Sequence, residues 1–478
     1  MNGLLLLACF TRWREFRMIQ QSISRSVSYL NPIVNVPIVS SWHVRHLAGL
    51  LMVVLATGAV AEEPNWAQWR GPNGTGKTSS VATVTDWDAS TNLKWRSPLP
   101  EAGNSTPVIW GDKMFITQPF AETKERGILC LERSSGKELW RRGVVYTESE
   151  PTHKTNPFCS ASPVTDGKRV IAWLGSAGLI CWDVDGTELW RRELGRQRHM
   201  WGYGSSPILH QDLCIVNFGP GEREFLIAVD KTTGQTVWQV DALQDAEERE
   251  LSGPENDGNA NEYQSEKERS VRLRGSWNTP IIARVGNRDE LIVALPRRLA
   301  AFDPLTGKSL WNCGGGAPLA YASVVEHRGV IVVLGGYNGA SMAVRAGGSG
   351  DVTETHRLWH KPRDNGWLGT GVADNGAVYV CDMGGVLHCI SVESGDIYWK
   401  SRVEGGGTWS SITQTADGMM HLLTKTGATT VFKPNQDKFD EVAVNELEEA
   451  TNASVVIAGG EVYVRTDLAL WCFAKRPL

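Results

Sequence analysis

Short apolar segments, separated by turns rich in Gly, Asp, Asn and Ser, recur along most of the chain. Residues 160–194 show one such unit clearly. It begins at Ser-Pro and continues with "RVIAWLG", a "SAG" turn, "LICWDV", an Asp-Gly turn and "ELWRREL". Apolar segments of this length that are bounded by turn residues predict β-strands. The unit therefore predicts four short antiparallel strands.

The same unit returns along the sequence, and its fourth strand ends on an aromatic marker. The markers are Trp95, Trp140, Trp190, Trp238, Trp311, Trp359, Trp399 and, in a degenerate copy, Phe439. They lie about 40 to 50 residues apart, except for a gap of 73 residues between Trp238 and Trp311. A four-stranded repeat of this period predicts β-propeller blades. We expect each tryptophan to dock against the neighbouring blade, because one blade cannot bury both of its faces.

Counting the markers predicts eight blades. The C-terminal segment "NASVVIAGGEVYVRTDLALWCFAK" supplies only three strands, and the isolated strand near Trp95 supplies the fourth. Joining both ends in one blade closes the ring without an exposed edge. The prediction is an all-β, eight-bladed propeller of four-stranded antiparallel blades over residues 91–478.

The first 61 residues have the form of a secretory leader. Arg45 precedes an apolar run from Leu47 to Val60, and Ala59-Val60-Ala61 matches a small-residue cleavage site. The run is short for a membrane span, which needs about 20 residues. We expect export to the periplasm or cell envelope, no transmembrane span in the mature chain, and a lead-in segment over residues 62–90. Met18 is an alternative start.

Net charge and cysteine positions bear on two further questions, whether the chain binds nucleic acid and whether it forms disulfides. The formal net charge of −5 gives no basic field for nucleic acid. Four of the eight cysteines that follow the leader, in "ILCLE", "LICWD", "LHCIS" and "LWCFA", occupy like positions in predicted strands, which favours buried free thiols over disulfides. Residues 241–270 hold ten acidic and three basic residues. This acidic insertion predicts a solvated loop, with a cation- or protein-binding lid as the alternative.

"GPNGTGKT", residues Gly71 to Thr78, matches the phosphate-binding loop pattern G-x-x-x-x-G-K-[ST]. Such a loop needs a buried strand before it and a helix after it. The preceding "AEEPNWAQWR" is polar and broken by Pro, and the following "SSVATVTDWDAS" has no apolar stripe at helical spacing. We expect a surface turn.

The repeat ending T-G-x-x-x-W, as in "TTGQTVW" and "LTGKSLW", resembles the tryptophan-docking repeat of the pyrroloquinoline-quinone (PQQ) propeller superfamily. "NWAQWRGPNGTGKT" resembles the lead-in of exported members. The resemblance covers residues 65–478 and implies the fold. It does not imply one activity, because the superfamily includes quinoprotein alcohol dehydrogenases and a non-catalytic lipoprotein of the outer-membrane β-barrel assembly machine.

Long blade links and the entrances of the first strands are the candidate ligand or partner face, because loops carry function on a rigid scaffold. The candidate residues are His153, Asn156, His199, Trp201, Tyr203, Arg274, Trp277, Tyr321, Trp367 and Trp409. Ring packing is the alternative role for these side chains. No spacing predicts a catalytic residue or a set of metal ligands.

The sequence favours a monomeric, non-catalytic propeller without a cofactor that binds a protein or an envelope polymer through its rim. The alternative is a dehydrogenase that oxidises an alcohol with PQQ and Ca²⁺, for which Asp351 and Asp364 are candidate acids. The chain lacks the vicinal disulfide and the C-x-x-C-H haem segment frequent in such enzymes. A sugar-like ligand is a third reading.

Overall fold

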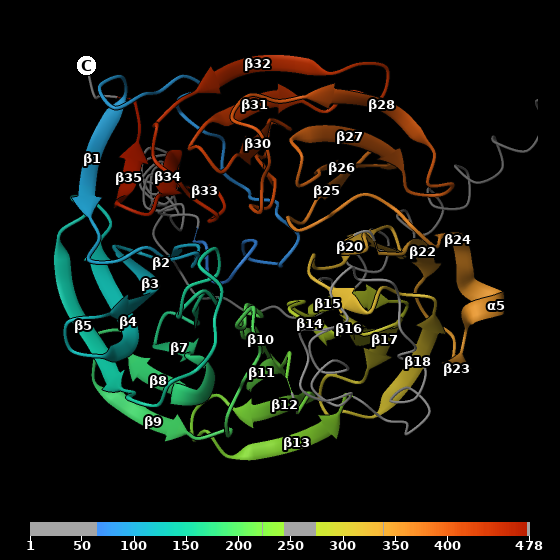
Figure 1. Cartoon of the computed structure of the whole chain (residues 1–478), viewed down its shortest axis with the longest axis horizontal. Coiled ribbons are helices and arrows are strands. Elements are labelled where there is room, and N and C mark those ends of the chain that lie inside the picture. Colours follow the sequence, from blue (N-terminus) through green and yellow to red (C-terminus); the bar gives the residue numbers. More distant parts are fainter. Residues whose placement is uncertain (1–64, 222, 243–273, 338, 476–478) are drawn as a thin grey trace, which may run out of the picture. The chain divides into compact units, whose positions relative to one another are not determined.

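The computed structural model describes residues 65–221, 223–242, 274–337 and 339–475. All of them lie in the second of the chain's two units, Glu63–Leu478. The predicted leader, the start of the lead-in segment and most of the acidic insertion lie outside the described residues. In the second unit, eight antiparallel sheets follow one another around a common axis (Figure 1). The predicted eight-bladed propeller is confirmed.

The first four blades follow in chain order. Blade 1 consists of β2 (Val108–Trp110), β3 (Lys113–Phe120), β4 (Glu125–Glu132) and β5 (Glu138–Val145). Blade 2 consists of β6 (Val164–Thr165), β7 (Arg169–Trp173), β8 (Leu179–Asp183) and β9 (Glu188–Arg192), with the short 3-10 helix η1 (Gly175–Ala177) between its middle strands. Blade 3 consists of β10 (Ile208–His210), β11 (Leu213–Phe218), β12 (Phe225–Asp230) and β13 (Thr236–Asp241). Blade 4 consists of β15 (Ile281–Val285), β16 (Arg288–Leu295), β17 (Arg298–Phe302) and β18 (Ser309–Gly314), with β23 (Gly350–Asp351) added at its edge.

The remaining blades complete the ring. Blade 5 consists of β20 (Val325–His327), β21 (Val330–Val333), β22 (Ser341–Arg345) and β24 (Arg357–Lys361), with the one-turn helix α5 (Thr353–His356) before its last strand. Blade 6 consists of β25 (Val372–Asp374), β26 (Ala377–Cys381), β27 (Val386–Ser391) and β28 (Ile397–Arg402). Blade 7 consists of β29 (Thr413–Gln414), β30 (Met420–Leu423), β31 (Thr429–Lys433) and β32 (Asp440–Asn445). Blade 8 consists of β33 (Val456–Ala458), β34 (Glu461–Arg465), β35 (Ala469–Phe473) and β1 (Leu93–Pro98). A separate two-stranded parallel pair joins β14 (Gly275–Ser276) and β19 (Leu319–Ala320).

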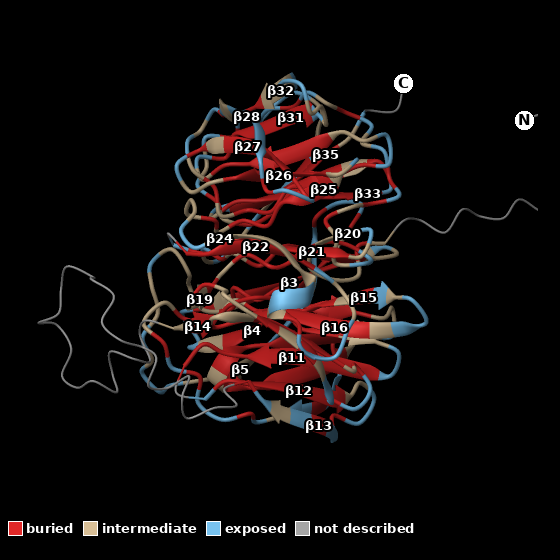
Figure 2. Ribbon diagram, turned by 90° about the vertical axis from the view of Figure 1, so that its right-hand side faces the viewer, coloured by how far each residue is buried: buried red, intermediate tan, exposed pale blue. Residues whose placement is uncertain are grey.

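The second and third strands of the blades form the core. Strands such as β11 and β35 are buried along their whole length, because neighbouring blades cover both of their faces (Figure 2). Fourth strands such as β5 and β13 are largely exposed. The apolar clusters accordingly lie between blades, as between blades 2 and 3, where Trp173, Tyr203 and Phe218 pack together.

Both ends of the second unit meet in blade 8. Strand β1 pairs antiparallel with β35, and Trp95 lies opposite Cys472 in the register. The blue strand and the red strand are side by side in Figure 1. The composite blade therefore has the predicted strands and closes the ring. All eight described cysteines are free and buried, as predicted.

A closed circle of hydrogen bonds joins the eight first strands near their starts. In each blade the backbone N–H of one residue donates to the side-chain hydroxyl of the equivalent residue in the next blade, over 2.9 to 3.2 Å. We call these residues the hydroxyl belt: Thr106, Ser162, Ser206, Thr279, Ser323, Thr370, Ser411 and Ser454. All are buried. The belt satisfies inner-edge N–H groups that no further strand could pair.

The docking tryptophans share one arrangement at six of the seams between blades. Each indole Nε1–H donates, over 2.8 to 3.1 Å, to a carbonyl in or beside the turn between the third and fourth strands of the next blade. The Gly of the T-G-x-x-x-W repeat explains the fit. At Gly234, φ is +70° and an added Cβ would lie 2.7 Å from the Trp190 ring. Only glycine both adopts this backbone and leaves room for the indole.

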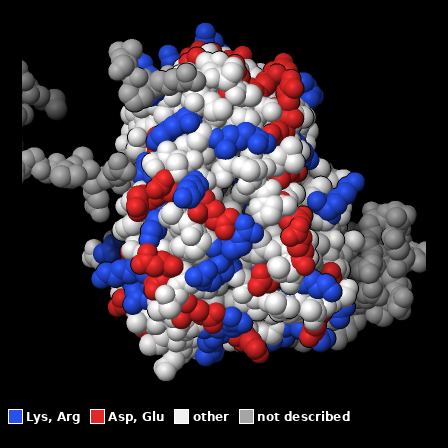
Figure 3. All heavy atoms as spheres, turned by 90° about the vertical axis from the view of Figure 1, so that its left-hand side faces the viewer, with Lys and Arg blue, Asp and Glu red and all other residues white. Residues whose placement is uncertain are grey.

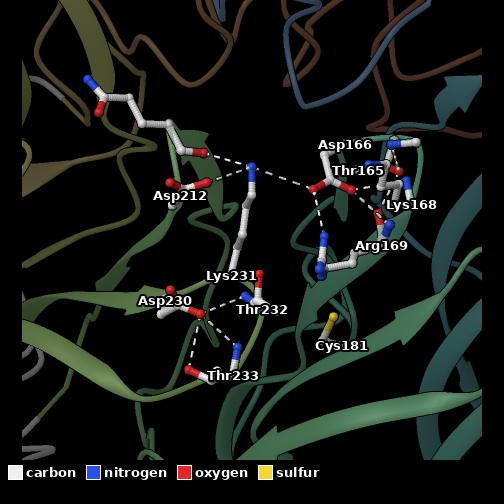
Figure 4. A network of polar contacts seen from close by, with 12 residues as sticks. Thr165, Asp166, Lys168, Arg169, Cys181, Asp212, Asp230, Lys231, Thr232 and Thr233 are labelled. Atoms are coloured by element: carbon white, nitrogen blue, oxygen red, sulfur yellow. Dashed lines mark hydrogen bonds and ion pairs between the residues drawn. The ribbon is translucent and has the colours of Figure 1, made fainter.

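Polar contacts reinforce the seam between blades 2 and 3 (Figure 4). The Lys231 ammonium lies 3.6 Å from both Asp166 of blade 2 and Asp212 of blade 3, and it donates to the Gln211 carbonyl over 2.8 Å. The Lys231 carbonyl in turn accepts the Trp190 indole N–H. Lys231 thus contributes both to the ion pairs at this seam and to the docking of Trp190.

The seam after blade 4 differs. The Trp311 indole donates to the Glu290 carboxylate over 2.7 Å instead of to a carbonyl. Strand β23 comes from residues 346–356, a Gly-rich insertion between β22 and β24 of blade 5, and it pairs in parallel with β18 and covers this outer edge. Trp311 is fully buried as a result. The insertion therefore substitutes for the regular turn at this seam.

The lead-in segment crosses the ring at the end where first strands turn into second strands. The Ala67 carbonyl accepts an N–H from Thr165 of blade 2, and Gly76 pairs with Gln414 of blade 7. Its blue trace runs through the middle of the ring in Figure 1. The segment therefore covers the centre of what we call the turn face of the propeller.

Arg70 anchors the lead-in segment. Its guanidinium donates to the carbonyls of Thr370 and Gly371 in blade 6 and to those of Gly74 and Thr75 in its own segment. Burial lowers its pKa to about 9. In the described residues on either side, 65–70 and 79–92, no strand leads into the "GPNGTGKT" stretch and no helix follows it. This stretch is therefore a structural turn and not a phosphate-binding loop.

Candidate binding face around the mouth ring

The propeller has a second face, opposite the turn face. It carries the turns between second and third strands and the links that lead into each first strand, and we call it the loop face. Because side chains alternate along an extended chain, the residue two positions before each belt residue lies in the next layer toward this face. We call that layer the mouth ring: Asn104, Ser160, Gly204, Trp277, Tyr321, Leu368, Trp409 and Asn452.

The mouth ring has two chemically different halves. Blades 4 to 7 contribute the large apolar side chains Trp277, Tyr321, Leu368 and Trp409, whereas blades 8, 1, 2 and 3 contribute Asn452, Asn104, Ser160 and Gly204. Six of the eight residues are partly exposed, while the belt beneath them is buried. The loop face therefore presents an aromatic half-circle beside a polar one.

The aromatic half is extended by the link before blade 3. The rings of Trp277 and Tyr321 are stacked, with centroids 4.6 Å apart and planes 25° apart. Trp201 lies 6.1 Å from Trp277 and 6.3 Å from Tyr321 and is tilted against both. His199 meets the edge of Trp277 at 5.0 Å. Four of the predicted site residues thus form one cluster.

The polar half holds the loop of residues 152–156. Side-chain amides of Asn104 and Asn452 both donate to the Thr155 carbonyl, over 2.9 and 3.2 Å. Asn156 donates to the carbonyls of Trp201 and Tyr203, over 2.7 and 3.0 Å. The loop therefore bridges the polar half of the mouth ring to the aromatic cluster. His153 lies on this loop, partly exposed, 2.7 Å from the Thr155 hydroxyl.

A cation lies over the last aromatic residue of the ring. The Lys425 ammonium sits 5.2 Å from the centroid of the Trp409 indole, and burial lowers its pKa. Among the described residues no carboxylate lies within ion-pair distance of Lys425. The positive charge is therefore held by an aromatic face alone.

A buried acid lies beside the aromatic cluster, between blades 3 and 4. Glu224 is 3 % exposed, and among the described residues its carboxylate has no side-chain hydrogen-bond partner. Burial raises its pKa to about 7, an effect that the Arg274 guanidinium and a hydrogen bond from the Gly221 backbone N–H oppose. The turn between the second and third strands of blade 3 thus holds a buried acid with a raised pKa.

Two predicted site residues are packing residues in the structure. Tyr203 is buried against Trp173, and its hydroxyl accepts the Cys159 N–H over 3.2 Å. Trp367 is fully buried and packs edge-on against His388. Neither side chain belongs to the exposed surface of the mouth ring. The seven docking tryptophans lie at the blade seams described above.

Sequence reasoning missed Lys425, Glu224 and Leu368. Lys425 lies in the "TKTG" turn between the second and third strands of blade 7, and Glu224 lies in the corresponding turn of blade 3. Such turns point to the loop face in every blade, so their position gave a usable signal. How far these side chains are buried depends on the neighbouring blade, and the local sequence pattern does not show this.

The residues at this face do not fit a calcium–quinone pair. The described residues contain no group of three or more His, Cys, Asp or Glu side chains that could hold a metal ion. The buried Glu224 carboxylate interacts with the positive charge of Arg274, which opposes the binding of a divalent cation. The nearby Asn217 amide donates to Ser276 and Asn278 instead. The stacking of Trp277 on Tyr321 leaves no space for a planar ring between them.

Charges of both signs are interspersed on the side of the propeller formed by the outer strands of blades 1 and 2 (Figure 3). Arg141 pairs with Glu138 on β5, and Arg191 pairs with Glu188 on β9. Such a surface has no extended field of one sign. In the described part of the chain, no helix has the length and apolar character needed to cross a membrane.

The family model for outer membrane protein assembly factor BamB matches residues 124–401 and 351–475. The chain belongs to this family. No curated protein matches the chain in sequence. The PQQ-like propellers it resembles include BamB and quinoprotein dehydrogenases, and membership does not decide between binding and catalysis.

Solved structures of both kinds share the fold. Quinohemoprotein alcohol dehydrogenase from Comamonas testosteroni is 12 % identical, with a TM-score of 0.60 over 89 % of this chain and 83 % of that one. BamB from Moraxella catarrhalis is 13 % identical, with a TM-score of 0.50 over 83 % and 98 %. The computationally designed protein Ika8 is 12 % identical, with a TM-score of 0.50 over 80 % and 99 %. At these identities the likeness establishes the propeller and nothing about activity.

Proposed function

We propose that this member of the BamB family is an exported, non-catalytic propeller that binds a macromolecule of the cell envelope on its loop face. One observation carries the proposal: the two faces are built differently. The lead-in segment covers the centre of the turn face, whereas the mouth ring leaves aromatic and polar side chains partly exposed on the loop face. Partly exposed aromatic residues are typical of binding surfaces.

Photo-cross-linking tests which face meets the partner. A benzophenone side chain is placed at position 154, exposed in the loop of residues 152–156, or at position 73, exposed in the lead-in segment. After irradiation of intact cells, we expect adducts from position 154 and none from position 73. Adducts from position 73 alone, or from neither position, would contradict the proposal.

The dehydrogenase alternative has its own test. The purified protein is titrated with PQQ and Ca²⁺ while tryptophan fluorescence is followed, and dye reduction is assayed with short alcohols. For a binding propeller we expect no turnover. Saturable quinone binding together with alcohol-dependent dye reduction would replace the binding function with an enzymatic one.

A further inference from the structure

Because the mouth ring has an aromatic half and a polar half, it suits a ligand with two kinds of surface. The aromatic half offers ring faces at Trp201, Tyr321 and Trp409, each partly exposed. The polar half offers the loop of residues 152–156, fixed by the amides of Asn104 and Asn452. A ligand that suits both has an apolar face and a hydrogen-bonding edge.

A pyranose ring has this combination. Its axial C–H groups form an apolar face that packs on an indole or phenol ring, whose face carries partial negative charge, and its hydroxyls project from the edge. The tilts of 44° and 52° between Trp201 and its neighbours present separate small faces, which suit successive sugars of a chain. They do not form one broad plane for a fused aromatic ligand.

Lys425 adds a charge requirement. Its ammonium is half-buried over Trp409 and, in the described part of the chain, has no carboxylate partner. A partly desolvated cation with an open coordination side attracts an anionic group. Lys361, on the outer strand β24, makes a similar contact with Trp359, 5.6 Å from the ring, but it donates to the Gly395 carbonyl in the turn before β28. The cation at the mouth ring therefore differs from its structural counterpart.

We propose that the mouth ring binds a carboxylate-bearing saccharide chain, with sugar faces on Trp201, Tyr321 and Trp409 and a carboxylate at Lys425. This inference rests on the proposed function, because it assigns the ligand class to the same loop face. The charged contact gives the site a preference for acidic over neutral sugars.

A matched pair of probes tests the charge requirement. Binding of tetragalacturonate and of its methyl ester to the full protein is measured by isothermal titration calorimetry. We expect the acid to bind at least tenfold more tightly than the ester. The Lys425→Gln variant should bind both probes equally, and Lys361→Gln should behave as the wild type. Thermal unfolding of each variant controls for loss of fold.

Three results would overturn the inference. They are absence of saturable binding to either probe at millimolar concentration, equal binding of both by the wild type, and retention of the preference in Lys425→Gln. Tight binding of PQQ that excludes tetragalacturonate would assign the mouth ring to a quinone instead. If the cross-link from position 154 forms and is unaffected by tetragalacturonate, the proposed function stands and only the ligand class is wrong.

Discussion

The two faces of the propeller use the same residue types for opposite purposes. On the turn face, Trp66 and Arg70 are 1 % and 3 % exposed, and the Arg70 guanidinium makes its hydrogen bonds within the protein. On the loop face, Trp409 and Lys425 are partly exposed, and the Lys425 cation rests only on an aromatic ring. Composition alone cannot separate these roles. The two roles differ in whether the charged group has hydrogen-bond partners inside the protein, because a buried polar group without a partner is costly.

This difference between the faces predicts that substitutions at the turn face lower stability more than those at the loop face. We expect the largest loss of stability on replacing Arg70. Replacing Arg70 with Ala leaves the buried Gly371 carbonyl without its side-chain donor and removes one of the two donors to the Thr370 carbonyl, which keeps the Ile412 N–H. We expect the free energy of unfolding to fall on the order of 3 kcal/mol. Chemical denaturation measures this. Gln68→Ala, which removes only an exposed bond to Pro72, is the control and should have little effect.

A buried histidine makes the same face sensitive to acid. His421 stacks on Trp87 of the lead-in segment, and burial lowers its pKa from 6.5 to about 4, while Asp417 acts in the opposite direction. Because the pKa is lower in the folded chain, this group's contribution to stability is complete above pH 6.5 and is lost as the pH falls toward 4. The loss amounts to about 3 kcal/mol.

Comparison with His421→Phe isolates this effect, because the variant keeps an aromatic ring but cannot be protonated. The difference in unfolding free energy between wild type and variant should be constant above pH 6.5 and should shift in favour of the variant between pH 6.5 and pH 4. Parallel pH profiles of the two proteins would refute the assignment.

The glycines under the docking tryptophans give a smaller effect. In Gly234→Ala, the new Cβ meets the Trp190 ring and the backbone keeps a left-handed φ. We expect a loss of about 2 to 3 kcal/mol. Gly286→Ala is the matched control, since its φ is +57° but nothing lies within 4 Å of the added Cβ, and it should cost about 1 kcal/mol. Equal losses would show that backbone strain alone fixes these glycines.

The smallest effect on stability is expected at the loop face. Trp409→Ala removes a partly exposed ring and should change the free energy of unfolding by no more than about 1 kcal/mol. The same substitution should weaken ligand binding by at least tenfold. A large loss of stability in Trp409→Ala would place this residue with the packing tryptophans and remove the contrast between the faces.

The fold was predictable because its signals are local and repeated. Most blades carry a T-G-x-x-x-W copy or a variant of it. At five of the six regular seams the glycine of one copy meets the docking tryptophan of the preceding blade, the seam of Trp399 being the exception. Degenerate copies could be recognised by their spacing. The composite blade followed from the missing fourth strand after Cys472.

The site was only partly predictable, because exposure depends on the next blade. Trp367 and Trp409 precede the belt residues of blades 6 and 7 by three and two positions. That single step places Trp367 in the seam against His388 and Trp409 in the mouth ring. Residues from the turns, such as Lys425, join the site only when the ring closes. The local sequence pattern does not show which neighbouring blade covers a residue, nor which turn residues reach the mouth ring.

The hydroxyl belt bears on how such rings change size in evolution. Every blade brings one N–H and one hydroxyl to the circle, and all eight bonds run in the same rotational sense. Duplication or deletion of a whole blade would therefore leave the circle with matched donors and acceptors. The innermost hydrogen bonds therefore do not fix the number of blades, which is left to the packing at the seams.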